Sequence, residues 1–231
     1  MQGKNPLKKF KMFKDVSHST LDWLWHAGRV EEFKKGSLLM RAKEPIRSVC
    51  IQLTGKSMVY NLTCAGRRKI IFIFGSGVLL NEHVQNFQLT SCYCETIETS
   101  RIFVIPVSRF LYGMEQDFTL VKAVLTIQEW KAWRLCHQLK NTMGSIGLEK
   151  KLAAKLWKLS RDFGKRTPEG IEIDINMPVT FLADILGAPR ETTSRLCNLL
   201  SGYGLIKMEK KRITILDSDR MAVFFKTGKI E

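Results

Sequence analysis

The stretch from Gly187 to Gly202, GAPRETTSRLCNLLSG, decides how the C-terminal part of the chain folds. On a helix that begins near Pro189, one side holds Thr193, Leu196, Cys197 and Leu200. The other side holds Glu191, Ser194, Arg195 and Asn198, with Arg190 at its rim. Gly187 supplies a tight turn after the apolar segment FLADIL (181–186), and Pro189 suits a first helical turn because its missing N–H costs nothing there. The stretch therefore predicts two short helices joined by a tight turn.

Two arginines and a glutamate crowd the first two turns of the second helix, and a solvated helix face is one explanation. A recognition helix is the other, because its N-terminal turns enter the DNA major groove. Arginine can donate twice to guanine, glutamate can accept from cytosine, and serine or threonine can hold a phosphate or a base edge. A glutamate repels phosphate, so it would weaken a purely electrostatic contact with DNA, but it can help to discriminate between bases. The pattern favours a DNA-binding helix-turn-helix.

A charged hairpin follows at the distance expected of a wing. Residues 205–216, LIKMEKKRITIL, predict two strands around a tip that includes Lys210. Before the helix pair, Leu148, Leu152, Leu156 and Leu159 predict an amphipathic helix that ends at Gly164, and residues 170–175, GIEIDI, alternate like a short strand. Residues 146–231 are thus expected to form a winged helix-turn-helix DNA-binding domain.

Residues 116–145 show a different period. Mostly apolar residues recur at alternating steps of three and four, at Phe118, Val121, Leu125, Gln128, Ala132, Leu135 and Leu139. This heptad seam predicts a helix of roughly thirty residues. The seam could pack within one chain, but a stripe between two domains favours a parallel two-helix dimer interface. A second face with Val124, Ile127, Trp130 and Trp133 would lie against the barrel of the same or the partner chain, and Gly144 and Gly147 are hinge candidates.

Residues 1–115 read as an effector-sensing β-domain. From Phe33 to Pro106, glycines separate short runs rich in β-branched and aromatic residues, which predicts an antiparallel sandwich or barrel. A short helix is expected over Ser19 to Glu32. The predicted fold class is α+β, with an N-terminal antiparallel β-barrel or jelly roll, a long dimerisation helix and a C-terminal winged helix-turn-helix.

Composition agrees with a nucleic-acid partner. The 231 residues carry a formal charge of +15, which attracts polyanions such as DNA or an acidic membrane surface. No apolar run of about 18 residues appears, and the N-terminus lacks the apolar centre of a signal peptide, so a cytoplasmic protein without a membrane partner is expected. The six cysteines are scattered without CxxC spacing, which predicts reduced thiols and no metal site.

The order of barrel, seam helix and winged helix-turn-helix resembles the CRP/FNR superfamily of bacterial transcription regulators. RETTSRLCNLLSGYGLI (190–206) is similar to its recognition-helix pattern, and Phe33-x-x-Gly36, Leu53-x-Gly55, Gly66 and Gly77 resemble its cyclic-nucleotide-binding-type barrel. The resemblance implies a homodimer that binds a near-palindromic site in double-stranded promoter DNA and contacts RNA polymerase, as an activator does. It implies base reading by Arg190, Glu191, Ser194 and Arg195 and a phosphate contact from Thr192. In one departure, only Phe181 separates Thr180 from Leu182-Ala183, so either Pro178 opens the first helix or that helix is shorter.

The sensor departs from two known branches of this superfamily. Gly77 and Glu82 resemble the cAMP-binding segment, but its Arg-Ser pair falls on Cys92 and Tyr93, so the positive charge that a cyclic phosphate needs is missing. The first cysteine is Cys50, which disfavours an N-terminal iron–sulfur cluster, and a lone His83 disfavours haem. What remains resembles the halorespiration regulators, with a small aromatic effector between the barrel and the long helix. The expected lining is Glu82, Tyr93, Trp130 and Trp133.

Three alternatives stay open at this point. A regulator without any effector would share every DNA-binding feature. A thiol-responsive regulator could use Cys92 and Cys94, although neighbours two apart on a strand point to the same face at a spacing that does not readily bridge. A cupin-type metal enzyme needs clustered histidines, whereas His18, His26, His83 and His137 lie far apart in the sequence. The chain is therefore not expected to be an enzyme.

Overall fold

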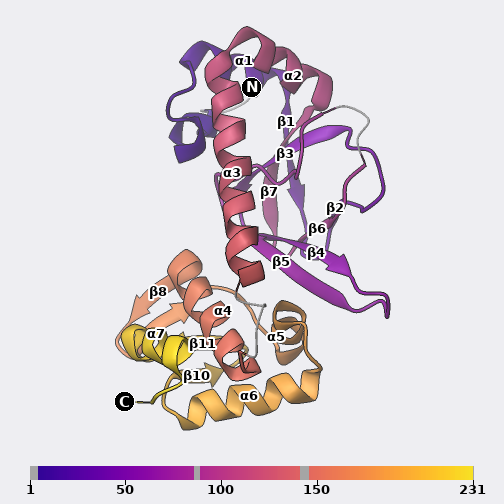
Figure 1. Ribbon diagram of the computed structural model, residues 1–231. Helices are drawn as coiled ribbons and strands as arrows, with labels where there is room; N and C mark the ends of the chain where they lie inside the picture. The colour runs from indigo at the N-terminus through magenta and orange to yellow at the C-terminus, as the bar shows by residue number, and fades with distance from the viewer. Residues whose placement is uncertain (1–4, 86–88, 141–145, 231) are drawn as a thin grey trace. The chain divides into compact units, whose positions relative to one another are not determined.

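The computed structural model describes residues 5–85, 89–140 and 146–230 (Figure 1). The chain divides into two compact units, one of residues 1–61 and 71–136 and the other of residues 62–70 and 137–231. The functional boundaries expected after residues 115 and 145 stay predictions. Gly144, one of the two expected hinge glycines, lies outside the described residues, and Gly147 directly precedes a helix.

The first unit begins with short helical segments. These are η1 (Pro6–Lys9), η2 (Lys11–Phe13) and α1 (His18–Ala27). Ser17 caps α1 by accepting a hydrogen bond from the backbone N–H of Thr20 at 3.1 Å. The expected extension of this helix to Glu32 was wrong, because β1 (Arg29–Phe33) follows at once and pairs with β7 (Ser100–Pro106). The chain crosses β7 closely at Gly28, where a Cβ would lie 2.4 Å from the Phe103 ring.

Two antiparallel sheets form the sandwich of this unit. One has the order β1-β7-β3 and the other the order β2-β6-β4-β5. Their remaining strands are β2 (Leu38–Met40), β3 (Ser48–Thr54), β4 (Ser57–Leu62), β5 (Arg68–Phe74) and β6 (Tyr93–Thr96). The expected jelly-roll-like β-domain is confirmed, although the two sheets stay separate over the described residues and do not close into a barrel.

The central strand β7 is buried on both faces. Ile102 and Val104 pack with residues of the second sheet, such as Phe72. Phe103 and Ile105 pack on the other side, in a cluster that includes residues of α1 and of the long helix. Side chains on a strand alternate between its faces, so an almost continuous apolar run places one set in each of two cores. The sheet is therefore a middle layer between helices and the second sheet.

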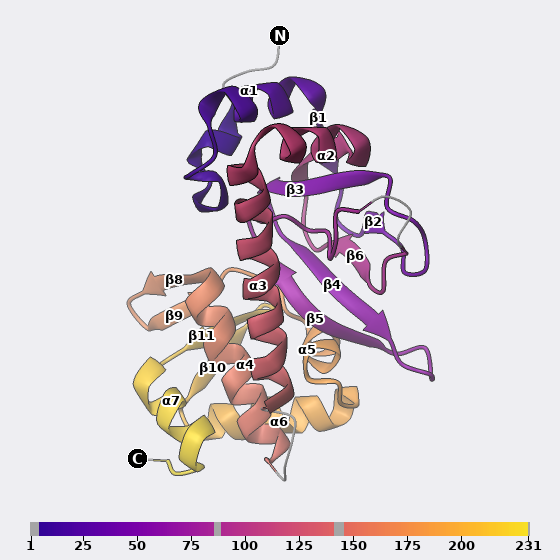
Figure 2. The same ribbon diagram turned by 45° about the horizontal axis from the view of Figure 1, so that its top comes forward.

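Two helices follow, α2 (Val107–Gln116) and α3 (Phe118–Lys140), and α3 belongs to the first unit as far as Cys136. Asp117 lies between them, and its carboxylate accepts hydrogen bonds from the Thr119 N–H at 2.8 Å and from the Thr20 hydroxyl at 2.6 Å. Hydrogen bonds from the hydroxyls of Thr119 and Thr20, with a smaller effect from the Thr119 N–H, hold the pKa of Asp117 well below its usual range. In Figures 1 and 2, α1 and α2 lie beside the N-terminal end of α3, the end that Asp117 fixes.

The second unit contains a four-stranded sheet in the order β10-β11-β9-β8. Its elements are α4 (Leu148–Phe163), β8 (Gly164–Thr167), β9 (Gly170–Ile173), α5 (Val179–Leu186), α6 (Arg190–Gly202), β10 (Ile206–Glu209), β11 (Arg212–Ile215) and α7 (Ser218–Thr227). The helix expected to end at Gly164 does so, and Leu152, Leu156 and Leu159 are buried. Among the described residues, no helix is both long and apolar enough to cross a membrane.

Candidate functional site

The turn between α5 and α6 is made by Gly187. This residue has a φ of 76°, in the left-handed region that glycine tolerates, and its N–H donates to the Ala183 carbonyl at 2.7 Å. At the other end of α5, Pro178 is the cap residue, so Pro178 opens the helix and Thr180 is its exposed second residue. The first of the two alternatives for this helix is confirmed.

The small and apolar side of α6 is buried. Thr193, Cys197 and Leu200 are almost inaccessible to solvent, and the Thr193 hydroxyl donates to the Pro189 carbonyl at 3.0 Å. A buried hydroxyl needs such a partner, and this one lies within the same helix. The helix is therefore fixed in rotation about its axis, and its opposite side faces outward.

That outward side carries the residues expected to read DNA. Arg190, Glu191 and Arg195 are exposed, and Thr192 and Ser194 are half-buried. Within the described parts of the chain, no hydrogen bond or ion pair ties the charged groups of these two arginines and the glutamate. Elsewhere in this unit charges are paired, as Lys207 is with Glu169 at 2.8 Å. The first two turns of α6 thus keep their donors and acceptors available for a ligand.

The hairpin of β10 and β11 places two lysines at its tip. Lys210 and Lys211 have φ values of 46° and 67°, and both are exposed. A two-residue connection with two positive φ values is a type I′ turn, which strongly favours Asn-Gly over residues with long side chains. The Lys211 carbonyl accepts from the Met177 N–H at 2.8 Å, which ties the turn to the segment before α5. The wing expected from the sequence is present.

The seam residues of α3 lie outward in the single chain. Phe118, Leu125, Leu135 and Leu139 are 66%, 52%, 46% and 61% exposed, Ala132 is exposed, and Val121 and Gln128 are half-buried. The opposite face of the helix carries Leu120, Ala123 and Val124, which are buried, and Ile127, which packs against the same core. The exposed apolar residues of the seam are therefore not what holds α3 on its own domain, although the half-buried Gln128 donates to the Asn81 carbonyl at 3.4 Å.

The four residues expected around an effector have separate surroundings. The Glu82 carboxylate accepts hydrogen bonds from the backbone N–H and the hydroxyl of Ser91. Tyr93 stacks on Tyr60 with ring centroids 5.2 Å apart, and the Trp130 ring lies 6.2 Å from Phe74. Trp133 is 58% exposed. The structure thus brings Trp130 onto the second sheet, and Trp133 has most of its surface in solvent.

A cavity of about 480 Å³ lies beside β2 and β3. Its volume is within the range of small-molecule sites. None of Glu82, Tyr93, Trp130 and Trp133 is among its described lining residues, which are Leu39, Met40, Arg41, Glu44, Pro45, Ile46, Arg47, Ser48, Cys50 and Thr90. Arg41 pairs with Glu44 at 3.3 Å, and the Thr90 hydroxyl donates to the Arg41 carbonyl at 2.6 Å. The sequence carried no signal for this cavity, because its charges lie in an irregular loop.

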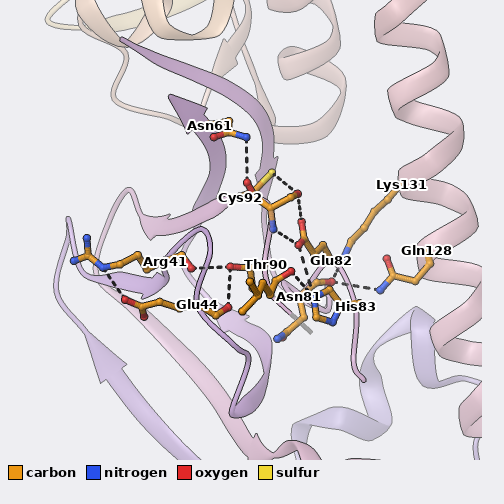
Figure 3. Close-up of polar contacts among 12 residues, drawn as sticks. Arg41, Glu44, Asn61, Asn81, Glu82, His83, Thr90, Cys92, Gln128 and Lys131 are labelled. Carbon is orange, nitrogen blue, oxygen red and sulfur yellow. Dashed lines mark hydrogen bonds and ion pairs between the residues drawn. The ribbon is translucent and has the colours of Figure 1, made fainter. Parts of the chain in front are cut away.

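Sequence reasoning also missed Lys131, which is only 5% exposed (Figure 3). Its ammonium group donates to the Asn81 carbonyl at 2.7 Å and lies 5.4 Å from the centroid of the Phe74 ring. Burial lowers the pKa of Lys131 to about 8, while the charge of the Glu82 carboxylate acts to raise it. α3 thus brings a positive charge near the Glu82 segment, whereas the positions expected to hold a cyclic phosphate carry Cys92 and Tyr93. The sequence did hold a signal for its burial, because Lys131 follows Val124 and Ile127 at helical spacing and so lies on the buried face of α3.

The comparisons with known proteins agree with this architecture. Residues 30–117 match the cyclic nucleotide-binding domain, and residues 150–224 match the Crp-like helix-turn-helix domain. The global nitrogen regulator of Synechococcus elongatus is 36% identical over 196 residues, which are 82% of this chain and 86% of that protein. This chain belongs to the CRP/FNR family of transcription regulators. The family is not enzymatic, and nothing in these matches indicates catalysis.

Other members of the CRP/FNR family extend the likeness over most of the chain. The probable transcriptional regulator flp of Lacticaseibacillus casei is 26% identical over 216 residues, covering 93% of this chain and 94% of that protein. A crystal structure of a CRP/FNR-family regulator from Eubacterium rectale superposes with a TM-score of 0.74 at 16% identity, covering 94% of this chain and 99% of that one. At such identity the structural likeness shows the fold alone.

The cysteines of this CRP/FNR regulator lie in surroundings that oppose ionisation. Burial raises the pKa of Cys50 to about 12 and also raises the pKa values of Cys92 and Cys94. Cys92 is half-buried directly before β6, and Cys94 on that strand is buried. A thiol that stays protonated is a poor nucleophile, so these surroundings do not favour thiol exchange. In the described ranges, no group of three or more histidine, cysteine or acidic residues could hold a metal ion.

Proposed function

We propose that the chain binds a near-palindromic promoter site as a homodimer and reads its sequence with α6. The observation that carries this proposal is the set of exposed, unpaired side chains of Arg190, Glu191 and Arg195 on the first two turns of that helix. Those turns are the part of a recognition helix that reaches base edges. Ser194 adds a further base contact, and Thr192 and the wing residue Lys210 contact phosphates.

The exposed seam of α3 supports the homodimer. A stripe with a phenylalanine and three leucines, each about half exposed, suits burial against the same stripe of a second copy. Parallel pairing of two α3 helices gives the assembly a two-fold axis, and a two-fold protein matches a near-palindromic site with half-sites about 34 Å apart. In this dimer, two α6 helices contact one face of the DNA. The DNA-bound dimer then contacts RNA polymerase and acts as an activator.

The N-terminal unit supports control by a small organic effector, since residues 30–117 match the cyclic nucleotide-binding domain. We retain Glu82, Tyr93, Trp130 and Trp133 as the residues around this effector, and an aromatic molecule as its class. Lys131 adds a buried positive charge beside the Glu82 segment, which favours an aromatic acid over a neutral ring. The family's arginine and serine for a cyclic phosphate are replaced by Cys92 and Tyr93, so cAMP is not proposed. Haem and an iron–sulfur cluster are not proposed either, because His83 is a lone candidate ligand and the first cysteine is Cys50.

The test uses operator fragments selected from the source genome and variants of each base pair in the selected site. Arg195→Ala should weaken binding by roughly 1–3 kcal/mol per half-site and relax the preference at one G·C position, because a bidentate base contact is lost. Lys210→Ala should weaken binding to all variants alike and flatten the salt dependence, as a phosphate contact does. If Arg195→Ala loses affinity equally for every operator variant, base reading by Arg195 is wrong.

A further inference from the structure

Asn81 connects three parts of the N-terminal unit and is completely buried. Its side-chain oxygen accepts from the Cys50 N–H at 2.7 Å, and its side-chain nitrogen donates to the Ser48 carbonyl at 3.0 Å. Its own carbonyl accepts from Lys131 at 2.7 Å and from Gln128 at 3.4 Å, both on α3 (Figure 3). One residue thus fastens β3 on one side and α3 on the other.

Each end of this connection reaches a functional surface. Ser48 and Cys50 line the cavity beside β2 and β3, and Glu82, the next residue along the chain, belongs to the proposed effector segment. At the other end, Gln128 is itself a seam residue of α3, and Lys131 precedes the seam residue Ala132. The cavity wall is therefore connected to the seam through the hydrogen bonds of Asn81, and Glu82 is connected to it through the peptide bond to Asn81.

The connection is stiff because breaking the hydrogen bonds at either end, to β3 or to Lys131, costs free energy. Leaving the Cys50 N–H or the Ser48 carbonyl without a partner in the interior costs the full desolvation of that group. The Lys131 ammonium is charged at neutral pH, and within the described residues the Asn81 carbonyl is its one hydrogen-bond acceptor. A buried charge follows its acceptor rather than lose it. When Asn81 shifts, the middle of α3 shifts with it.

We propose that Asn81 is a positioning residue that passes changes at the effector segment and the β3 cavity wall to the dimer seam of α3. This inference rests on the proposed function as an effector-controlled dimeric regulator. The ligand does not touch the seam. It moves Asn81, and the Asn81 carbonyl moves Lys131 and Gln128.

Hydrogen–deuterium exchange on the full chain tests the connection without knowledge of the effector. Asn81→Leu keeps a similar volume but cannot bond to Ser48 or Cys50, and it should speed exchange of the amides around residues 124–132 by about tenfold. The matched control is Gln52→Leu, because Gln52 is a fully buried amide on β3, the strand that Asn81 fastens, and in the described structure its side chain bonds to Thr54 and Ser57 rather than to α3. That control should change exchange in the sheets but leave α3 as it is.

Lys131→Met removes the connection from its other end and keeps the test decisive if Asn81→Leu folds poorly. It should speed exchange over the same amides, and the double variant should exchange no faster than the faster single variant, because the two act through one linkage. Equal exchange of α3 in Asn81→Leu and Gln52→Leu would overturn the inference, as would additive effects in the double variant. Either result leaves base reading by Arg195 standing, since that is measured separately on DNA.

Discussion

The helices α3 and α6 expose opposite kinds of side chain. In α6 the apolar side, with Cys197 and Leu200, is buried, and charged Arg190 and Arg195 lie outside. In α3 a charged residue, Lys131, is buried, while Leu125 lies half exposed. A helix that meets water or a polar ligand has the first arrangement. The second is typical of a helix whose outer surface meets another apolar surface, so the comparison separates the surface proposed for DNA from the surface proposed for a second chain.

The largest effect is expected when the exposed apolar side of α3 is made charged, which tests whether this side holds two chains together. Replacing both Leu125 and Leu135 with Asp places four carboxylates at the proposed seam of a dimer, and we expect the dissociation constant to rise at least about a thousandfold. Sedimentation velocity on the full chain checks the mass. Thr126→Asp, an exposed position off the seam, is the control and should leave the dimer intact. An unchanged dimer in the double variant would show that the seam does not hold two chains together.

The buried side of α3 can be tested by pH. Burial lowers the pKa of Lys131 from 10.5 to about 8, so between these pH values the unfolded chain binds more protons than the folded chain. The contribution of this group to the free energy of unfolding therefore rises with pH, by about 3 kcal/mol over the whole window. Lys131→Met should lack this rise.

Chemical denaturation of both proteins between pH 7.5 and 10 measures the difference. Two other groups act on Lys131, the carboxylate of Glu82 and the thiol of Cys94, and burial keeps the pKa of that thiol raised, so it stays protonated in this window. Parallel stability curves for the two proteins would show that Lys131 is not buried as a charge.

The two sides of α6 should respond to mutation in different measurements. Thr193→Val removes a buried hydroxyl that bonds to Pro189, and we expect a loss of about 1–2 kcal/mol in the free energy of unfolding. Ser194→Ala, one residue further on and half-buried, should change stability by less than about 0.5 kcal/mol but weaken operator binding. Thermal denaturation and DNA titration of both variants decide. A stability loss from Ser194→Ala as large as that from Thr193→Val would contradict the assignment of the two sides.

The smallest expected effect concerns the wing. Lys210→Asn with Lys211→Gly gives the residues that a type I′ turn prefers, and relief of the two positive φ values should stabilise the domain by up to about 1 kcal/mol. The same change removes two positive charges per chain and should weaken DNA binding with a flatter salt dependence. A variant that is more stable and binds DNA as before would show that Lys210 and Lys211 do not contact the phosphate backbone of the DNA.

The sequence predicted local features well and long-range contacts poorly. The α5–α6 pair and the wing follow from turn chemistry and helical periodicity within short stretches, so GAPRETTSR and MEKKR were sufficient. The end of α1 was missed because pairing of β1 with β7, about seventy residues away, decides it. The strand β8 was missed because GKRT is exposed along its whole length and shows no alternation. The Asn81–Lys131 contact joins residues 50 positions apart and has no local pattern at all.

Asp117 gives α3 one fixed end, since it caps the helix and bonds to Thr20 of α1. When a rigid helix rotates about one fixed end, the displacement of each residue grows with its distance from that end. With a rise of about 1.5 Å per residue, Lys131 lies roughly 20 Å from Asp117 and Lys140 roughly 34 Å. A shift of about 1 Å where Asn81 holds Lys131 then becomes a shift of nearly 2 Å at the C-terminal turn of α3. A small displacement of Asn81 would therefore produce a larger displacement at the C-terminal end of α3.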